Sequence, residues 1–189
     1  MSAGGPFFIP FQGLLAAAIL LNSPTQDSPQ SRFVDSPIEG VIVNSLPVHQ
    51  DSRGWLLELH REDQCDSGLA PCMAYASLTL PGISRGPHEH VEQTDRFCFF
   101  GPSDFLITLW DNRPASPTFN HRMRFVVGES TPSLVVVPNG VVHGYRNIGR
   151  ESGLIVNLPD RLYMGHQRQE EVDEIRHELN PDSPFQLED

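Results

Sequence analysis

The chain has 189 residues, of which 39% are hydrophobic and 20% charged, and it carries a formal net charge of −11. This length and balance fit one globular domain with a sizeable core, while the acidic charge disfavours nucleic acid as a partner because it repels phosphate backbones. Three cysteines without a CxxC pair disfavour a disulfide framework and a structural zinc site, so a reducing compartment, the cytoplasm, is expected.

The first 37 residues are expected to lie outside the folded domain. An apolar run at 7–21 is interrupted by Pro10, Gln12 and Gly13, and it is too short for a membrane-spanning helix, which needs about 20 apolar residues. No basic residue precedes the run, as a secretory signal would require. Residues 23–37 have the composition of a linker. We predict a poorly ordered or loosely packed extension over 1–37, a folded domain over 38–189, and no membrane partner.

From Ile38 onward, short β-type runs alternate with turn residues. Runs rich in β-branched and aromatic residues occupy 41–46, 55–60, 74–80, 96–100, 104–110, 123–127, 133–137 and 153–158. Many short strands at regular spacing indicate an antiparallel sandwich or barrel rather than a parallel α/β sheet. Near the C-terminus, residues 165–178 are charged and lack an apolar stripe, so we expect a short helix or an extended tail.

Three histidines have a spacing that brings them together in such a fold. His88 and His90 are two residues apart, and alternation along a strand places both on one face. His143 follows the turn at 138–140 and begins another strand, which brings its imidazole against the first pair. A lone histidine is more often a surface residue, but an HxH pair facing a third histidine predicts a polar, histidine-lined pocket.

Two segments around these histidines resemble the signatures of the cupin superfamily. They read Gly-x5-His-x-His, beginning at Gly82, and Pro-x-Gly-x2-His-x3-Asn, from Pro138 to Asn147. The resemblance implies a jelly-roll β-barrel. It also implies an alternative in which His88, His90, Asp95 and His143 hold a divalent transition metal, since imidazole and carboxylate suit Fe, Mn, Ni or Zn. The first segment departs from metal-binding cupins, because it offers Thr94 or Asp95 where they usually place a glutamate.

A second resemblance covers residues 38–185 and is more specific. The motif Asp51-x-Arg53-Gly54-Trp55-x-x-Glu58, the later Arg85-Gly86-x-His88, then Asp111-Asn112-Arg113 and the Pro-x-Gly-x-x-His-Gly-Tyr segment occur in the order typical of one family. Tyr163 and Asp173-Glu174-Ile175-Arg176 resemble its C-terminal motifs. The chain is similar to the dTDP-4-dehydrorhamnose 3,5-epimerase family, as a divergent member.

This resemblance implies roles for several residues in a reaction that moves a proton beside a ketone. His88 matches the catalytic base, and Arg96 stands where the family usually has a lysine that holds the enolate oxygen. Asp173 is the expected carboxylate partner of the base, with Asp182 as an alternative. The family's proton-donating tyrosine has no counterpart in 153–158, so Tyr145 or Tyr163 would have to replace it.

The resemblance also implies how a nucleotide sugar would be bound. Arg53 and Arg85 match positions that contact the diphosphate, and guanidinium groups suit such bidentate pairing. The other expected substrate-binding residues are Glu58, His90, His143, Tyr145 and Tyr163, the last stacking on the base. Members of the family are generally homodimers in which the strand bearing 51–58 crosses to the neighbour, so Arg53 would act in the partner's pocket. No cofactor is expected.

Four functions are therefore compatible with the sequence. The first is an epimerase acting on a dTDP-4-keto-6-deoxyhexose, with a place in dTDP-rhamnose or other carbohydrate biosynthesis. The second is a sugar 3,4-ketoisomerase, because such cupins also carry HxH after Arg-Gly. The third is a metal-dependent cupin such as a dioxygenase, and the fourth is a sugar-binding cupin without catalytic activity.

Overall fold

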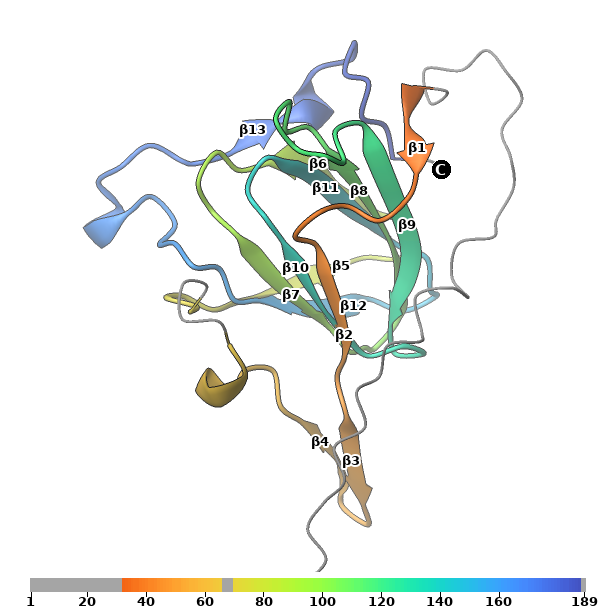
Figure 1. The fold of residues 1–189 in the computed structure, drawn as a ribbon. Coiled ribbons are helices and arrows are strands. Elements are labelled where there is room, and N and C mark those ends of the chain that lie inside the picture. Colours follow the sequence, from red (N-terminus) through yellow and green to blue (C-terminus); the bar gives the residue numbers. More distant parts are fainter. Residues whose placement is uncertain (1–31, 66–69, 188–189) are drawn as a thin grey trace, which may run out of the picture.

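The computed structural model describes residues 32–65 and 70–187, and it confirms an antiparallel jelly-roll β-barrel (Figure 1). Two sheets face each other around the core. The six-stranded sheet has the order β1 (Val34–Asp35), β9 (His121–Gly128), β8 (Asp104–Asp111), β11 (Val141–Asn147), β6 (Ser84–Glu89) and β13 (Ile175–Arg176). The five-stranded sheet has the order β2 (Ile42–Ser45), β10 (Ser133–Val137), β7 (Asp95–Phe99), β12 (Gly153–Asn157) and β5 (Tyr75–Thr79).

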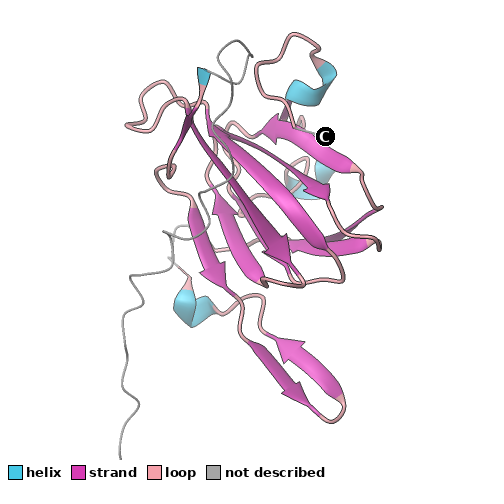
Figure 2. Cartoon of the chain, turned by 90° about the vertical axis from the view of Figure 1, so that its right-hand side faces the viewer, coloured by secondary structure: helices cyan, strands magenta, loops and turns pink. Residues whose placement is uncertain are grey.

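A separate hairpin stands apart from the barrel. It consists of β3 (Val48–Asp51) and β4 (Gly54–Leu57), which pair only with each other among the described strands. The hairpin extends away from both sheets, and the view turned by 90° shows the same (Figures 1 and 2). Its apolar side chains Val48, Trp55 and Leu56 are exposed, so within this chain the hairpin lacks the packing that would bury them.

The core fills the space between the two sheets. Alternation along the strands turns one set of side chains inward, and aromatic rings from both sheets meet there. The ring of Tyr145 on β11 lies 5.5 Å from Phe99 on β7 and 5.6 Å from Phe105 on β8. Other core residues are Ile38, Phe97, Ile107, Leu109, Val127, Val135, Val137, Val141 and Ile155. This apolar core fills the barrel interior next to the histidines.

The ends of the described chain pack on the outside of the six-stranded sheet. Phe33 lies 5.6 Å from Phe185 and 6.3 Å from Trp110 between ring centroids, and β1 pairs in parallel with β9. Asp35 accepts a 2.7 Å hydrogen bond from Arg122. Strand β1 therefore lies inside the segment that we expected to be an extension, because Phe33 packs against the apolar rings of Trp110 and Phe185. Residues 1–31 lie outside the described part.

The C-terminal segment forms short turns and one short strand rather than a helix of any length. It contains the 3-10 turns η3 (His166–Arg168) and η4 (His177–Leu179), with β13 between them, and an earlier turn, η2, spans Glu62–Gln64. In the described residues, no helix is long and apolar enough to cross a membrane.

We predict that Asn147→Ala destabilises the fold. Asn147 is fully buried at the end of β11, where its amide donates to the carbonyls of Thr79 and Glu151 at 2.9 and 2.8 Å and its oxygen accepts from Ser103 at 2.6 Å. Leaving these partners unsatisfied should lower the free energy of unfolding by at least about 2 kcal/mol, measured by urea denaturation. The exposed Asn44→Ala is the control, and equal stability of the two variants would contradict the prediction.

Candidate active site

Three histidines meet at one end of the barrel interior, as the sequence predicts. His88 lies on β6, His90 follows directly after it, and His143 lies opposite His88 on β11. Their ring centroids are 4.4 Å apart for His88 and His143, and 5.5 Å apart for His88 and His90. Alternation places His88 and His90 on the inner face, and Glu89 between them points to the outer face, where His177 and Asn112 donate to it at 2.9 Å each.

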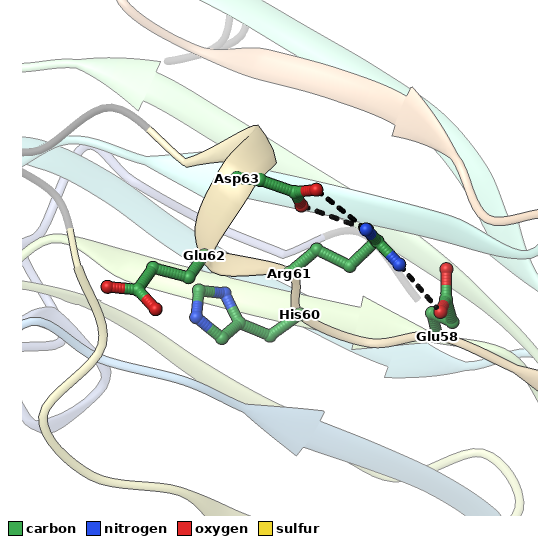
Figure 3. A pocket seen from close by; sticks show the side chains of 5 residues that line it. All are labelled: Glu58, His60, Arg61, Glu62 and Asp63. Atoms are coloured by element: carbon green, nitrogen blue, oxygen red, sulfur yellow. Dashed lines mark hydrogen bonds and ion pairs between the residues drawn. The ribbon is translucent and has the colours of Figure 1, made fainter.

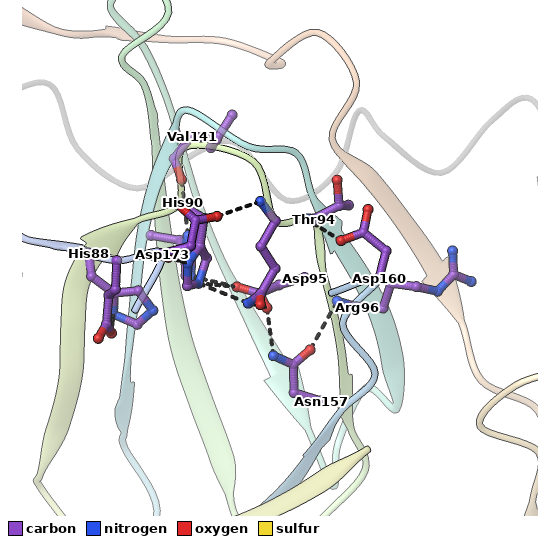
Figure 4. Close-up of polar contacts among 12 residues, drawn as sticks. His88, His90, Thr94, Asp95, Arg96, Val141, Asn157, Asp160 and Asp173 are labelled. Carbon is purple, nitrogen blue, oxygen red and sulfur yellow. Dashed lines mark hydrogen bonds and ion pairs between the residues drawn. The ribbon is translucent and has the colours of Figure 1, made fainter. Parts of the chain in front are cut away.

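A buried carboxylate lies at the centre of this cluster. Asp95, at the start of β7, has a side chain that is 1% exposed, and its Oδ2 lies 3.1 Å from Nε2 of both His90 and His143 (Figure 4). Its Oδ1 accepts hydrogen bonds from the amides of Gln93 at 2.8 Å and Asn157 at 2.7 Å. One group thereby orients four side chains, two from the loop after β6 and one from each sheet.

This arrangement sets different protonation states for the histidines. Burial lowers the pKa of His88 to about 2, and the neighbouring His143 and His90 rings act in the same direction, so the His88 ring is neutral. Burial also opposes charge on His90, but the hydrogen bond and charge of Asp95 outweigh it and raise the pKa of His90 to about 9. Burial would raise the pKa of Asp95, yet His143 and His90 hold it well below its usual range.

Backbone carbonyls orient two of the rings from behind. Nδ1 of His90 donates to the carbonyl of Asp173, and Nδ1 of His143 donates to the carbonyl of Val141 at 3.0 Å. Because a carbonyl oxygen can only accept, each Nδ1 carries a proton. The Nε2 atoms of both rings therefore face Asp95 in a fixed orientation.

The structure corrects the role expected for Asp173. Its carboxylate accepts the backbone N–H groups of Val91, Glu92 and Gln93 at 2.9 Å each, so it anchors the loop after β6 and does not pair with His88. The next residue does: Oε1 of Glu174 lies 3.7 Å from Nδ1 of His88, and Glu174 is itself held by Arg176 at 2.7 Å. Asp182, the alternative, is exposed.

Arg96 does not face the histidine cluster either. Asp95 points inward, so alternation along β7 turns Arg96 to the outer face of the five-stranded sheet, and Figure 4 shows its side chain extending away from the histidines. The side chain is buried there, and within the described residues its Nε has no hydrogen-bond partner. Arg96 is therefore not placed to hold an oxygen beside His88.

The tyrosine that faces the site is one that the sequence did not single out. Tyr145 is 4% exposed and packs among core rings, while Tyr163 is exposed in the segment after β12. Tyr75, at the start of β5, is paired with Asn157 on β12, and its hydroxyl accepts a 3.0 Å hydrogen bond from the Asn157 amide. The sequence pattern that could have identified Tyr75 is the alternation of the polar Tyr75, Ser77 and Thr79 with the outward Ala76 and Leu78.

The residues that we expected to bind the diphosphate and the nucleobase lie far apart in this chain. Arg53 is 87% exposed at the tip of the β3–β4 hairpin, where it pairs with Asp51 at 2.6 Å. Glu58 lies at an open hollow after β4, beside Arg61 (Figure 3). That hollow is lined by Glu58, His60, Arg61, Glu62 and Asp63 and shares no residue with the histidine cluster. Arg85, on β6, donates to Thr79 Oγ1 at 2.9 Å and to the Leu78 carbonyl at 2.8 Å.

The cluster also has the composition of a metal site. One ligand atom from each of His88, His90, Asp95 and His143 lies within 4.8 Å of the others. The same four groups thus serve two kinds of chemistry on geometry alone: proton transfer by a neutral imidazole, or coordination of a cation.

Known proteins match most of the described chain. The family model for dTDP-4-dehydrorhamnose 3,5-epimerase matches residues 35–175. The chain is 38% identical over 128 residues to the probable low-salt glycan biosynthesis epimerase Agl13 of Haloferax volcanii, covering 67% of this chain and 81% of that protein. It is 33% identical over 135 residues to the spore coat polysaccharide biosynthesis protein SpsL of Bacillus subtilis, covering 70% and 87%.

Solved structures give the same fold. A dTDP sugar isomerase from Desulfovibrio desulfuricans superposes with a TM-score of 0.68 at 22% identity, covering 79% of this chain and 91% of that one. At this identity the likeness establishes the barrel architecture, and the family assignment rests on the sequence matches.

Proposed function

The chain belongs to the dTDP-4-dehydrorhamnose 3,5-epimerase family, a family of isomerases, and we propose that its histidine cluster epimerises a nucleotide-linked 4-keto-6-deoxyhexose. The single observation that carries the proposal is a neutral, inward-facing His88 in contact with Glu174. The names of the relatives support a place in glycan biosynthesis. We place the protein in the cytoplasm because of its few cysteines without a CxxC pair. The dioxygenase and non-catalytic alternatives have no support from the family.

Epimerisation beside a ketone needs a base, a group that stabilises the enolate oxygen, and an acid on the other face of the sugar ring. His88 fits the base, because its ring is neutral and so has a free lone pair. Glu174, at 3.7 Å from Nδ1, would stabilise the imidazolium that forms when His88 takes the proton. Arg176 holds that carboxylate in place. The proton transfer itself requires no redox cofactor.

Tyr75 is the proposed acid. His88 belongs to the six-stranded sheet and Tyr75 to the five-stranded sheet, so the two groups face the barrel interior from opposite sides. Tyr75 is 44% exposed as a residue, but the burial of its hydroxyl end beside Asn157 raises its pKa, so the hydroxyl stays protonated at neutral pH. Since the Asn157 amide donates to that oxygen, the tyrosine's own proton is left free to be given to a substrate carbon.

We also propose that a homodimer completes the binding site. The β3–β4 hairpin, with Arg53 at its turn, extends away from β6 and β11, which bear the histidines (Figure 1), and Trp55 and Leu56 on it are 56% and 61% exposed. A neighbouring barrel would bury these side chains and bring the Arg53 guanidinium to a partner's substrate, where it would bind the diphosphate. Arg85 would make a similar contact from its own barrel.

The test of the base is exchange of solvent deuterium into dTDP-4-keto-6-deoxyglucose, followed by NMR. We expect His88→Gln to slow exchange by roughly 10²- to 10⁴-fold, because a positioned base contributes about that much. The exposed His166→Gln is the matched control. Exchange at C3 and C5 supports a 3,5-epimerase and exchange at C3 alone a 3-epimerase or a 3,4-ketoisomerase. Undiminished exchange in His88→Gln would remove His88 as the base.

Comparing Glu174→Gln with Asp173→Asn in the same assay distinguishes the roles of these two neighbouring carboxylates. Glu174→Gln should slow exchange and alter its pH profile without loss of stability, since it touches His88. Asp173→Asn should chiefly lower the free energy of unfolding, since it anchors the loop at 91–93. The opposite pattern would restore Asp173 as the partner of the base.

Tyr75→Phe should uncouple exchange from inversion. The base still removes the proton, so exchange into the starting sugar should continue, whereas formation of the epimer should fall roughly 100-fold because its acid is gone. NMR measures both signals in one reaction, and Tyr163→Phe is the control. Equal loss of exchange and inversion, or unaffected inversion, would argue against Tyr75 as the acid.

The shared site predicts that two inactive variants complement each other. In a mixture of Arg53→Ala and His88→Gln subunits, about half of the dimers are mixed, and each mixed dimer holds one intact site, so activity should recover to about one quarter of wild type. His88→Gln mixed with Tyr75→Phe should recover nothing, because both residues come from one barrel. A mixture no more active than its components would contradict the shared site.

A further inference from the structure

A buried polar contact lies on the outer face of β6, directly behind the histidines. Glu89 stands between His88 and His90 in the chain, and its side chain is 8% exposed. Its Oε1 accepts hydrogen bonds from Nε2 of His177 and from the amide of Asn112, each at 2.9 Å. Because a buried carboxylate is costly unless donors satisfy it, Glu89 depends on both partners.

His177 belongs to the C-terminal segment that lies along β6. It begins η4 directly after β13, and β13 pairs with β6 over two residues (Figure 1). Both side chains of β13 are exposed, whereas the ring of His177 lies 4.7 Å from that of Phe185 between centroids. A strand that is so short and buries so little apolar surface opens readily, so contacts at its two ends must fix its position.

Two anchors flank β13. Before it, the carboxylate of Asp173 accepts three backbone N–H groups from the loop after β6. After it, His177 donates to Glu89. Glu174, which contacts His88, lies between the two anchors. Because a slip of an extended segment by one residue turns each side chain to the other face, loss of one anchor would move the Glu174 carboxylate away from the base.

We infer that Glu89 and His177 are positioning residues for the base, on which they act only through Glu174. Glu89 points away from the barrel interior, so neither side chain of the pair touches the substrate. The pair holds the Glu174 carboxylate 3.7 Å from Nδ1 of His88, where it stabilises the imidazolium that forms during proton transfer. This role rests on the proposed function, whereas the anchoring of β13 does not.

The first test removes the donor of the pair in the full chain. His177→Leu keeps apolar bulk against Phe185 and should slow deuterium exchange into dTDP-4-keto-6-deoxyglucose roughly 10-fold, as for coupled residues of one network, with KM changed less than about twofold. His177→Gln, whose amide N–H reaches the place of Nε2, should restore the rate to within about threefold of wild type. His177→Asn, one carbon shorter, should not restore it. The exposed His166→Leu is the matched control.

A double-mutant cycle with Glu174→Gln separates positioning from a general loss of stability. In that background, His177→Leu should slow exchange by less than about a further twofold, since the carboxylate that it positions is already gone. Equal slowing in both backgrounds would overturn the proposal. So would a His177→Leu rate equal to that of wild type, and the epimerase would then stand without these positioning residues.

Amide hydrogen exchange followed by mass spectrometry tests the anchor independently of the reaction. In His177→Leu, the peptide that spans 173–179 should lose protection by more than about tenfold, whereas His177→Gln should keep it. Unchanged protection in His177→Leu would overturn the anchor. A wild-type protein that exchanges no deuterium into the sugar would refute the epimerase and the positioning role together, and amide protection would still decide whether His177 anchors β13.

Discussion

A carboxylate with almost no contact with solvent is the group on which the pocket depends. Burying the charge of Asp95 would be prohibitive without compensation. The compensation comes from two amides and two imidazoles, which approach it from β11, β12 and the loop after β6. Each contact fixes one side chain, so the directions of His90, His143 and Asn157 all follow from one residue. The hydrogen bonds that compensate the buried charge of Asp95 thus also fix the geometry of the site.

Much of this fold is readable from the sequence. The period-two alternation and turn residues indicated the strands, and the spacing of His88, His90 and His143 indicated that their rings meet, because both signals are local properties of a β-chain. Strand β1, within the extension predicted at 1–37, was not expected, since the packing of Phe33 against Trp110 and Phe185 joins residues far apart in the sequence. No local pattern encodes such a contact.

The site was harder to predict because a displacement by one residue changes the face. Arg96 follows the inward Asp95 and therefore points outward, and Glu174, not Asp173, turns toward His88. In both cases a family motif gave the right segment and the wrong neighbour. Tyr75, which we propose as the acid, was not predicted for a related reason: β5 lies beside β12 in the sheet but about eighty positions away in the chain.

The barrel and its pocket also differ in when they become available to a growing chain. All of the strands from β2 to β12 have been synthesised once residue 157 is made. The loop at 91–93 and the ring of His90 must wait for Asp173, and His88 waits for Glu174. Because domains fold as the chain emerges, the barrel can form around an unfinished pocket. The histidines reach their final arrangement only when the last segment closes over them.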